Sequence, residues 1–153
     1  MSTQVLQPAR PLAADDVALA RVLKQAGVGK DDLIRVTGPA GLTAVLCLYR
    51  HGYERASYVH ANWINATRGA DALLIPHPCG TTELAAMIQG ADCLREGGVL
   101  IVQLEADRSA LAADSVPGLL RHVGYDVGSG LSEKGREVCI ARRRSLPGFR
   151  KAA

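Results

Sequence analysis

The sequence predicts an α/β fold: a three-layer, doubly wound, mostly parallel sheet with an antiparallel C-terminal strand. Short apolar runs alternate with stretches of helical spacing through most of the 153 residues. Such alternation is typical of a parallel sheet covered by helices on both faces. The expected strands are almost continuously apolar, which indicates burial on both faces. A short turn joins the last two strands, so these two must run antiparallel.

The first half of the chain begins with a helix and then alternates. The helix is expected to begin near Ala14, where two aspartates favour a helix start, and to end at Gly27. It is followed by a strand over Asp32–Thr37, a helix over Leu42–His51 that ends at a glycine, and a strand over Ala56–His60.

The second half continues the alternation and closes with two strands. A strand over Asp71–Ile75 is broken by Pro76-His77-Pro78, and a helix capped by Thr81 runs to Leu94. Gly97 and Gly98 precede the next strand, Val99–Leu104. The remaining elements are a helix over Asp114–His122, a strand over Gly124–Gly128, a turn over Ser132–Gly135 and a strand over Glu137–Ala141.

We expect a single domain over residues 14–144, between a loose N-terminal segment (1–13) and a basic tail (145–153). A chain of this length can fold without a metal or a disulfide. Its four cysteines form no CxxC pair, so we interpret them as reduced thiols in a cytoplasmic protein. No apolar run approaches the roughly 20 residues that span a bilayer, so no membrane association is expected.

The C-terminal end is the most basic part of the chain. Five arginines and lysines and no acid lie between Arg142 and Lys151, while the rest is mildly acidic. Such an end could bind nucleic acid, although a solvated tail is the commoner interpretation. Aromatic residues make up only 4% of the chain, which argues against a stacking surface for single strands. A homodimer is a further possibility that the sequence leaves open.

Two segments carry a family resemblance. Leu94–Val102 reads LREGGVLIV, and the chain closes with GYDV and GREVCIARRR. With the order of elements, these resemble the class I S-adenosylmethionine-dependent methyltransferases over about residues 34–143. The resemblance implies a Rossmann-like fold, S-adenosylmethionine as cofactor, and methyl transfer to a small molecule or a protein.

The resemblance also implies where a cofactor would lie. Thr37, Gly38 and Gly41 replace the family's glycine loop at the methionine end of the cofactor, and His60 or Asn62 falls near the ribose. Independently of the family, ligands of open α/β sheets bind at the carboxyl ends of strands. Backbone amides at a helix start also attract anions.

The Pro-His-Pro segment falls on the substrate side of such a site. Pro76 is assigned to the cofactor site and His77 is our choice of general base, since histidine titrates near neutral pH. Cys79 could act as a nucleophile if its pKa were lowered. A rigid loop without chemistry is the alternative. A metal site is not expected, because His77 and Cys79 lack the further ligands that zinc needs.

The sequence departs from the family at three places. No acid ends the first strand, and Pro39 or Ala40 replaces the central glycine of the loop. No carboxylate follows the second strand either. Only ten residues separate His60 from Asp71, too few for a further crossover, so we expect the sheet to lack one strand. These departures favour an alternative, a non-catalytic binding or assembly module that has lost its cofactor.

Overall fold

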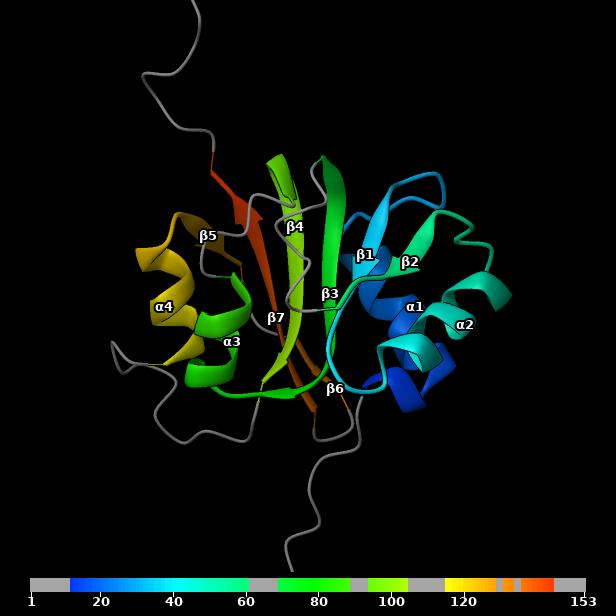
Figure 1. Ribbon diagram of the computed structural model, residues 1–153, viewed down its shortest axis with the longest axis horizontal. Helices are drawn as coiled ribbons and strands as arrows, with labels where there is room; N and C mark the ends of the chain where they lie inside the picture. Colours follow the sequence, from blue (N-terminus) through cyan, green and yellow to red (C-terminus); the bar gives the residue numbers. More distant parts are fainter. Residues whose placement is uncertain are drawn as a thin grey trace, which may run out of the picture.

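A computed structural model describes residues 12–60, 69–88, 94–104, 115–128, 131–133 and 136–144. Figure 1 shows a central sheet with helices on both faces. The helices are the 3-10 turn η1 (Leu12–Ala14), α1 (Asp16–Gln25), α2 (Gly41–Arg50), α3 (Thr81–Ile88) and α4 (Val116–His122). The strands are β1 (Ile34–Val36), β2 (Ala56–Tyr58), β3 (Ala70–Cys79), β4 (Leu94–Leu104), β5 (Tyr125–Val127), β6 (Leu131–Glu133) and β7 (Arg136–Arg143).

The strand order confirms the predicted fold class. The sheet runs β2-β1-β3-β4-β7-β5, and β6 pairs with β7. Strands β1 to β4 are parallel, whereas β7 is antiparallel to β4, β5 and β6. Within the described part of the chain, β2 is the edge strand and no further strand pairs with its outer side, as expected for a sheet that lacks one strand.

Two apolar cores lie on the two faces of the sheet. Alternate residues of a strand point to opposite faces, so Ile34, Val36 and Leu74 pack with α1 and α2. Leu73 and Ile75 pack on the other face, with α3 and α4. The helices lie to either side of the sheet in Figure 1. Both faces are therefore buried, which explains the almost continuously apolar strands.

Two predicted element boundaries are wrong around α3 and β4. The helix expected over Thr81–Leu94 ends at Ile88 among the described residues, and Leu94 is the first residue of β4. Gly97 and Gly98, expected before the strand, lie inside it, where the pairing of β3 with β4 shifts register. Gly97 has φ +76°, so the two glycines form a bulge within the strand and do not start it.

Two predicted loops also belong to strands. Pro76-His77-Pro78 does not break β3, which continues to Cys79 through a second register shift. The turn expected over Ser132–Gly135 is partly β6, which pairs with the first part of β7. Both segments contain residues with low strand propensity, and their pairing with a neighbouring strand overrides it.

The ends of the domain are more closely tied to the fold than the sequence suggested. Leu12, assigned to the loose N-terminal segment, is buried, and its backbone N–H donates to Gln103 Oε1 at 2.6 Å. At the other end, Arg142 donates to the carbonyls of Ala26 and Gly97, and Arg144 pairs with Asp126 at 2.8 Å. Residues 1–11 and 145–153 lie outside the description, so the domain boundaries stay a prediction.

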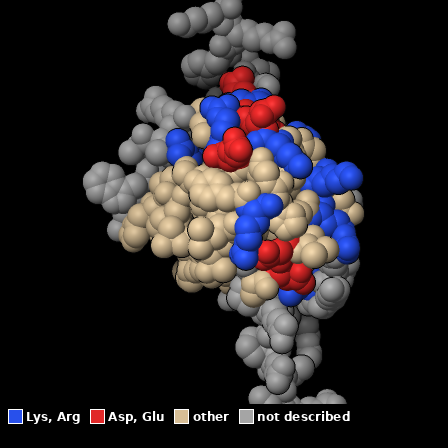
Figure 2. Space-filling view, turned by 90° about the vertical axis from the view of Figure 1, so that its right-hand side faces the viewer, with Lys and Arg blue, Asp and Glu red and all other residues tan. Residues whose placement is uncertain are grey.

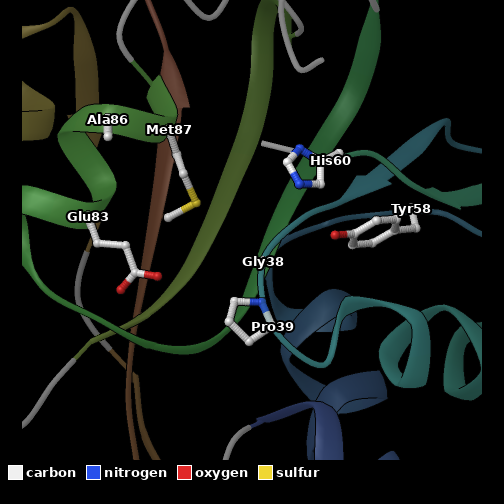
Figure 3. Close-up of a pocket in the computed structure, with 7 residues that line it drawn as sticks. All are labelled: Gly38, Pro39, Tyr58, His60, Glu83, Ala86 and Met87. Carbon is white, nitrogen blue, oxygen red and sulfur yellow. The ribbon is translucent and has the colours of Figure 1, made fainter. Parts of the chain in front are cut away.

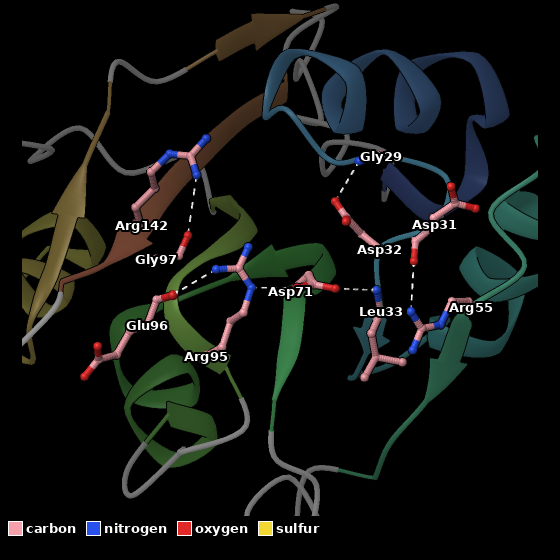
Figure 4. Close-up of polar contacts among 10 residues, drawn as sticks. All are labelled: Gly29, Asp31, Asp32, Leu33, Arg55, Asp71, Arg95, Glu96, Gly97 and Arg142. Carbon is pink, nitrogen blue, oxygen red and sulfur yellow. Dashed lines mark hydrogen bonds and ion pairs between the residues drawn. The ribbon is translucent and has the colours of Figure 1, made fainter. Parts of the chain in front are cut away.

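The amino ends of the parallel strands form one edge of the sheet, which we call the amino edge. There Asp71 accepts hydrogen bonds from the Leu33 N–H at 2.8 Å and from Arg95 Nε at 2.6 Å. Figure 4 shows these contacts side by side with a bond from Arg55 to the Asp31 carbonyl. These contacts link the starts of β1, β2, β3 and β4. We call the opposite edge, formed by the carboxyl ends of the parallel strands, the carboxyl edge.

Candidate functional site

The turn between β1 and α2 lies at the carboxyl edge and is conformationally unusual. Gly38 has φ +96° and Ala40 has φ +62°. Among the described residues, Ala40 is the one non-glycine residue with positive φ. It precedes α2 without a side-chain cap. A non-glycine residue in this region carries strain, and such strain often marks a functional site.

His77 packs directly against this turn. A Cβ atom on Gly38 would lie 2.2 Å from Cε1 and 2.7 Å from Nδ1 of the His77 ring. Only glycine can occupy position 38, because it must both adopt a positive φ and leave room for the ring. The glycine turn and the Pro-His-Pro segment therefore lie at the same edge of the sheet, in contact with each other.

The His77 ring is held by a carboxylate from α3. Its Nε2 atom lies 2.9 Å from Glu83 Oε1, and the side chains are 9% and 46% exposed. An ionised carboxylate can only accept a hydrogen bond, so Nε2 is the donor. The other ring nitrogen, Nδ1, is buried and has no hydrogen-bond partner. Nδ1, which lies next to Gly38, is therefore the ring nitrogen that the described residues leave unpaired.

A pocket of about 430 Å³ opens between this turn, the end of β2 and α3. This volume falls within the range of small-molecule sites. In Figure 3, Glu83 and Met87 extend from α3 on one side of the pocket, His60 and Tyr58 lie on the other side, and Gly38 and Pro39 lie between them. The pocket is lined by Gly38 and Pro39 from the turn, Tyr58 and His60 from β2 and the loop after it, and Glu83, Ala86 and Met87 from α3.

The predicted cofactor residues are distributed unevenly around this pocket. Gly38 and His60 line it. Thr37 is fully buried, is not part of the lining, and its hydroxyl has no hydrogen-bond partner. Gly41 is covered by the ring of Tyr58, whose Cδ2 atom would lie 2.7 Å from an added Cβ. This glycine is thus required by packing, whether or not a ligand binds.

The other predicted site residues either do not line the pocket or lie outside the described part of the chain. Pro76 is buried in β3 and does not line the pocket. Asn62 lies outside the described residues, and so does the side chain of Cys79. His77 contacts both Gly38 of the turn and Glu83 of the lining.

The sequence interpretation gave no site role to five of the lining residues, Pro39, Tyr58, Glu83, Ala86 and Met87. Glu83 and Met87 are four residues apart, with Ala86 between them, so they share one face of α3. That spacing is visible in the sequence. The sequence does not show which element this face of α3 meets, because that depends on how α3 packs across the sheet.

The pocket lining carries a negative charge that no lysine or arginine of the lining balances. Glu83 contributes a carboxylate to the lining, and the lining residues within the described part of the chain include no Lys or Arg. Arg35 faces the same side of the sheet as Leu73, its neighbour in register. Arg35, in β1, donates a hydrogen bond to Ser57 of β2 and does not line the pocket. The site is therefore suited to a cationic group.

The possible metal ligands among the described residues are dispersed, and the described cysteine side chains are buried. No group of three or more histidine, cysteine, aspartate or glutamate side chains lies together in the part that the structure describes. Burial raises the pKa of the Cys139 thiol to about 11 and also raises the pKa of Cys47. Both cysteines are buried and form no disulfide, and a thiol with a raised pKa is a poor nucleophile.

The chain has the fold of the class I S-adenosylmethionine-dependent methyltransferases. It is similar to precorrin-6y C5,15-methyltransferase from Geobacter metallireducens, at 15% identity and a TM-score of 0.58, over 91% of this chain and 94% of that one. A second similar structure is the release-factor-specific protein-(glutamine-N5) methyltransferase from Alicyclobacillus acidocaldarius, at 11% identity and a TM-score of 0.52, over 90% and 99% of the chains.

A third similar structure is much longer than this chain. Phosphoethanolamine N-methyltransferase 2 from Haemonchus contortus, in complex with S-adenosylhomocysteine, aligns at 11% identity and a TM-score of 0.61. The alignment covers 91% of this chain and only 39% of that one. No protein-family model and no curated protein sequence matches. At these identities the similarity establishes the fold alone.

Proposed function

We propose that the protein binds S-adenosylmethionine in the pocket at the carboxyl edge and transfers its methyl group to a small molecule or a protein. The observation that carries this proposal is the placement of the pocket. It lies where open α/β sheets bind ligands, beside a strained glycine turn and two buried polar atoms without partners, Thr37 Oγ1 and His77 Nδ1.

The residues of the pocket fit the cofactor in size and charge. A volume of about 430 Å³ can hold a nucleoside joined to an amino acid. S-adenosylmethionine supplies a methyl group on a positively charged sulfur atom, and Glu83 provides a negative charge in the lining. The turn at Gly38 would hold the methionine end. His60, and Asn62 after it, would lie toward the ribose.

His77 is the proposed general base. Its Nε2 atom is bonded to Glu83, so proton transfer from an acceptor group would use Nδ1 beside Gly38. A histidine whose one ring nitrogen donates to a carboxylate keeps its other nitrogen as a hydrogen-bond acceptor, the form that a general base needs. Pro76, directly before it in β3, would fix the backbone of this segment.

Binding of the cofactor is the decisive test. Thermal or chemical unfolding with and without S-adenosylmethionine or S-adenosylhomocysteine should show added stability, about 2.7 kcal/mol at 100 times the dissociation constant. Ala86→Phe, which fills the pocket, should abolish the effect. Thr82→Phe is the matched control, because Thr82 is exposed on the same helix and outside the lining. No stabilisation of the wild-type protein by millimolar ligand would contradict the proposal.

A second candidate function is a binding or assembly module without catalysis. No acid ends β1, at Arg35 or Val36, and no carboxylate is available at positions 60–62, after β2, for the ribose. Leu42, Leu46 and Tyr49 are exposed on one side of α2, and Figure 2 shows the uncharged surface on this side of the molecule. Such a surface would suit a homodimer contact, which analytical ultracentrifugation can test.

Nucleic-acid binding and the cellular location also remain parts of the proposal. A nucleic-acid contact would depend on Arg150 and Lys151, since Arg142 and Arg144 are bonded within the fold. None of the described helices has the length and apolar character needed to cross a bilayer. The cytoplasmic location stays part of the proposal.

A further inference from the structure

We infer that Glu83 makes the pocket select a positively charged ligand over a neutral one of the same shape. The inference deepens the proposed function, on which it rests for the identity of the natural ligand. It assigns to Glu83, a residue that the sequence did not point to, the role of a specificity-determining residue.

The carboxylate of Glu83 is fixed in position before any ligand arrives. One oxygen, Oε1, accepts a hydrogen bond from His77 Nε2 at 2.9 Å. The His77 ring is itself confined, because it packs against Gly38 where a Cβ atom would clash. A charged group held by a buried partner does not have to reorganise when a ligand binds, and this strengthens its effect on ligand charge.

The same carboxylate still faces the pocket. Its side chain is 46% exposed, whereas that of His77 is 9% exposed. Figure 3 shows it extending from α3 toward the turn at Gly38 and Pro39. Met87, one turn further along α3, forms an apolar wall beside it. A charge next to apolar surface is screened less by water than one in open solvent.

The charge of Glu83 is not balanced within the lining. The lining residues that the structure describes carry no Lys or Arg. A sulfonium or ammonium group in this pocket would therefore meet a carboxylate, and a neutral thioether would gain nothing from it. S-adenosylmethionine and S-adenosylhomocysteine form such a pair, since they differ by one methyl group and one positive charge.

Calorimetry with these two ligands tests the inference. In Glu83→Gln, which keeps the side-chain shape, the affinity for S-adenosylmethionine should fall about tenfold, equivalent to about 1.4 kcal/mol. The affinity for S-adenosylhomocysteine should stay within about twofold, which also shows that the variant is folded. Glu96→Gln, at the opposite edge of the sheet, should change neither. Equal losses for both ligands in Glu83→Gln would overturn the inference.

A second measurement does not depend on the proposed function. The chain has two methionines, so the labelled methyl group of Met87 can be assigned and followed by NMR during titration. Trimethylsulfonium should shift this signal at lower concentration than dimethyl sulfide, its neutral counterpart, and Glu83→Gln should remove the difference. If both probes act alike on the wild-type protein, the inference is wrong even when the cofactor binds. If neither cofactor form binds but the probes differ, only the proposed function fails.

Discussion

The two edges of the sheet differ in how completely their polar groups are paired. At the amino edge, Asp71 accepts hydrogen bonds from the Leu33 N–H and from Arg95 (Figure 4). Arg142 donates there to the backbone carbonyls of Ala26 and Gly97. At the carboxyl edge, Thr37 Oγ1 and His77 Nδ1 are buried without partners. A buried polar atom without a partner costs about 1–3 kcal/mol.

This difference indicates a division of roles within one sheet. The amino edge holds four strands together and has a purely structural explanation. The carboxyl edge retains unpaired groups and a strained turn that stability alone does not explain. Proteins accept such costs mainly where a ligand is bound. The variants below should therefore affect mainly stability at the amino edge, and binding as well at the carboxyl edge.

The largest effect is expected for Gly38→Ala. The added methyl group would clash with the His77 ring, which adds about 1–3 kcal/mol of overpacking to about 1–2 kcal/mol of backbone strain. Gly124→Ala is the matched control, because Gly124 has φ +104° and no atom within 4 Å of an added Cβ. Urea unfolding should show a clearly larger loss for Gly38→Ala, with loss of ligand binding. Equal losses would mean that the contact with His77 is loose.

A smaller loss of stability, without loss of binding, is expected for Asp71→Ala. The variant leaves the Leu33 N–H and Arg95 without their acceptor, and hydrogen bonds to charged groups contribute about 1.5–3 kcal/mol. Asp126→Ala is the control, since its ion pair with Arg144 is exposed and exposed pairs contribute about 0–1 kcal/mol. Ligand affinity measured on both variants should be that of the wild type. A weakened affinity in Asp71→Ala would show that the edges are coupled.

The same aspartate should make the protein sensitive to acid. The hydrogen bond from the Leu33 N–H, followed by that from Arg95, lowers the pKa of Asp71. A carboxyl group with a lowered pKa in the folded state stabilises the fold above its unfolded pKa of about 3.9. This contribution is lost as the pH falls through the folded pKa. Between about pH 5 and pH 2, the wild-type protein should lose more stability than Asp71→Ala. Parallel curves of unfolding free energy against pH would contradict this.

Local sequence patterns were enough to predict the fold and part of the site. Alternating apolar runs identified the parallel strands. The glycine turn after the first strand lies at the edge where the pocket opens, and ligand binding there stays a prediction. β6 was missed because its polar residues resemble a turn, and only pairing with β7 makes them a strand. Glu83 was missed because its contact with His77 depends on the packing of α3. A sequence does not show whether a buried hydroxyl, such as that of Thr37, has a hydrogen-bond partner.

That hydroxyl gives the smallest and most discriminating test. Thr37→Val replaces an unpaired buried hydroxyl with a methyl group, so the free energy of unfolding should stay the same or rise by up to about 1 kcal/mol. Ser115→Ala removes an equally small group, but Ser115 caps α4 by accepting from the Gly118 N–H at 3.2 Å, and its loss should cost about 1 kcal/mol. If Thr37 pairs with a ligand, Thr37→Val should also weaken cofactor affinity. A variant with lower stability and unchanged affinity would show that the hydroxyl serves the fold, and the contrast between the two edges would then lose one of its two unpaired atoms.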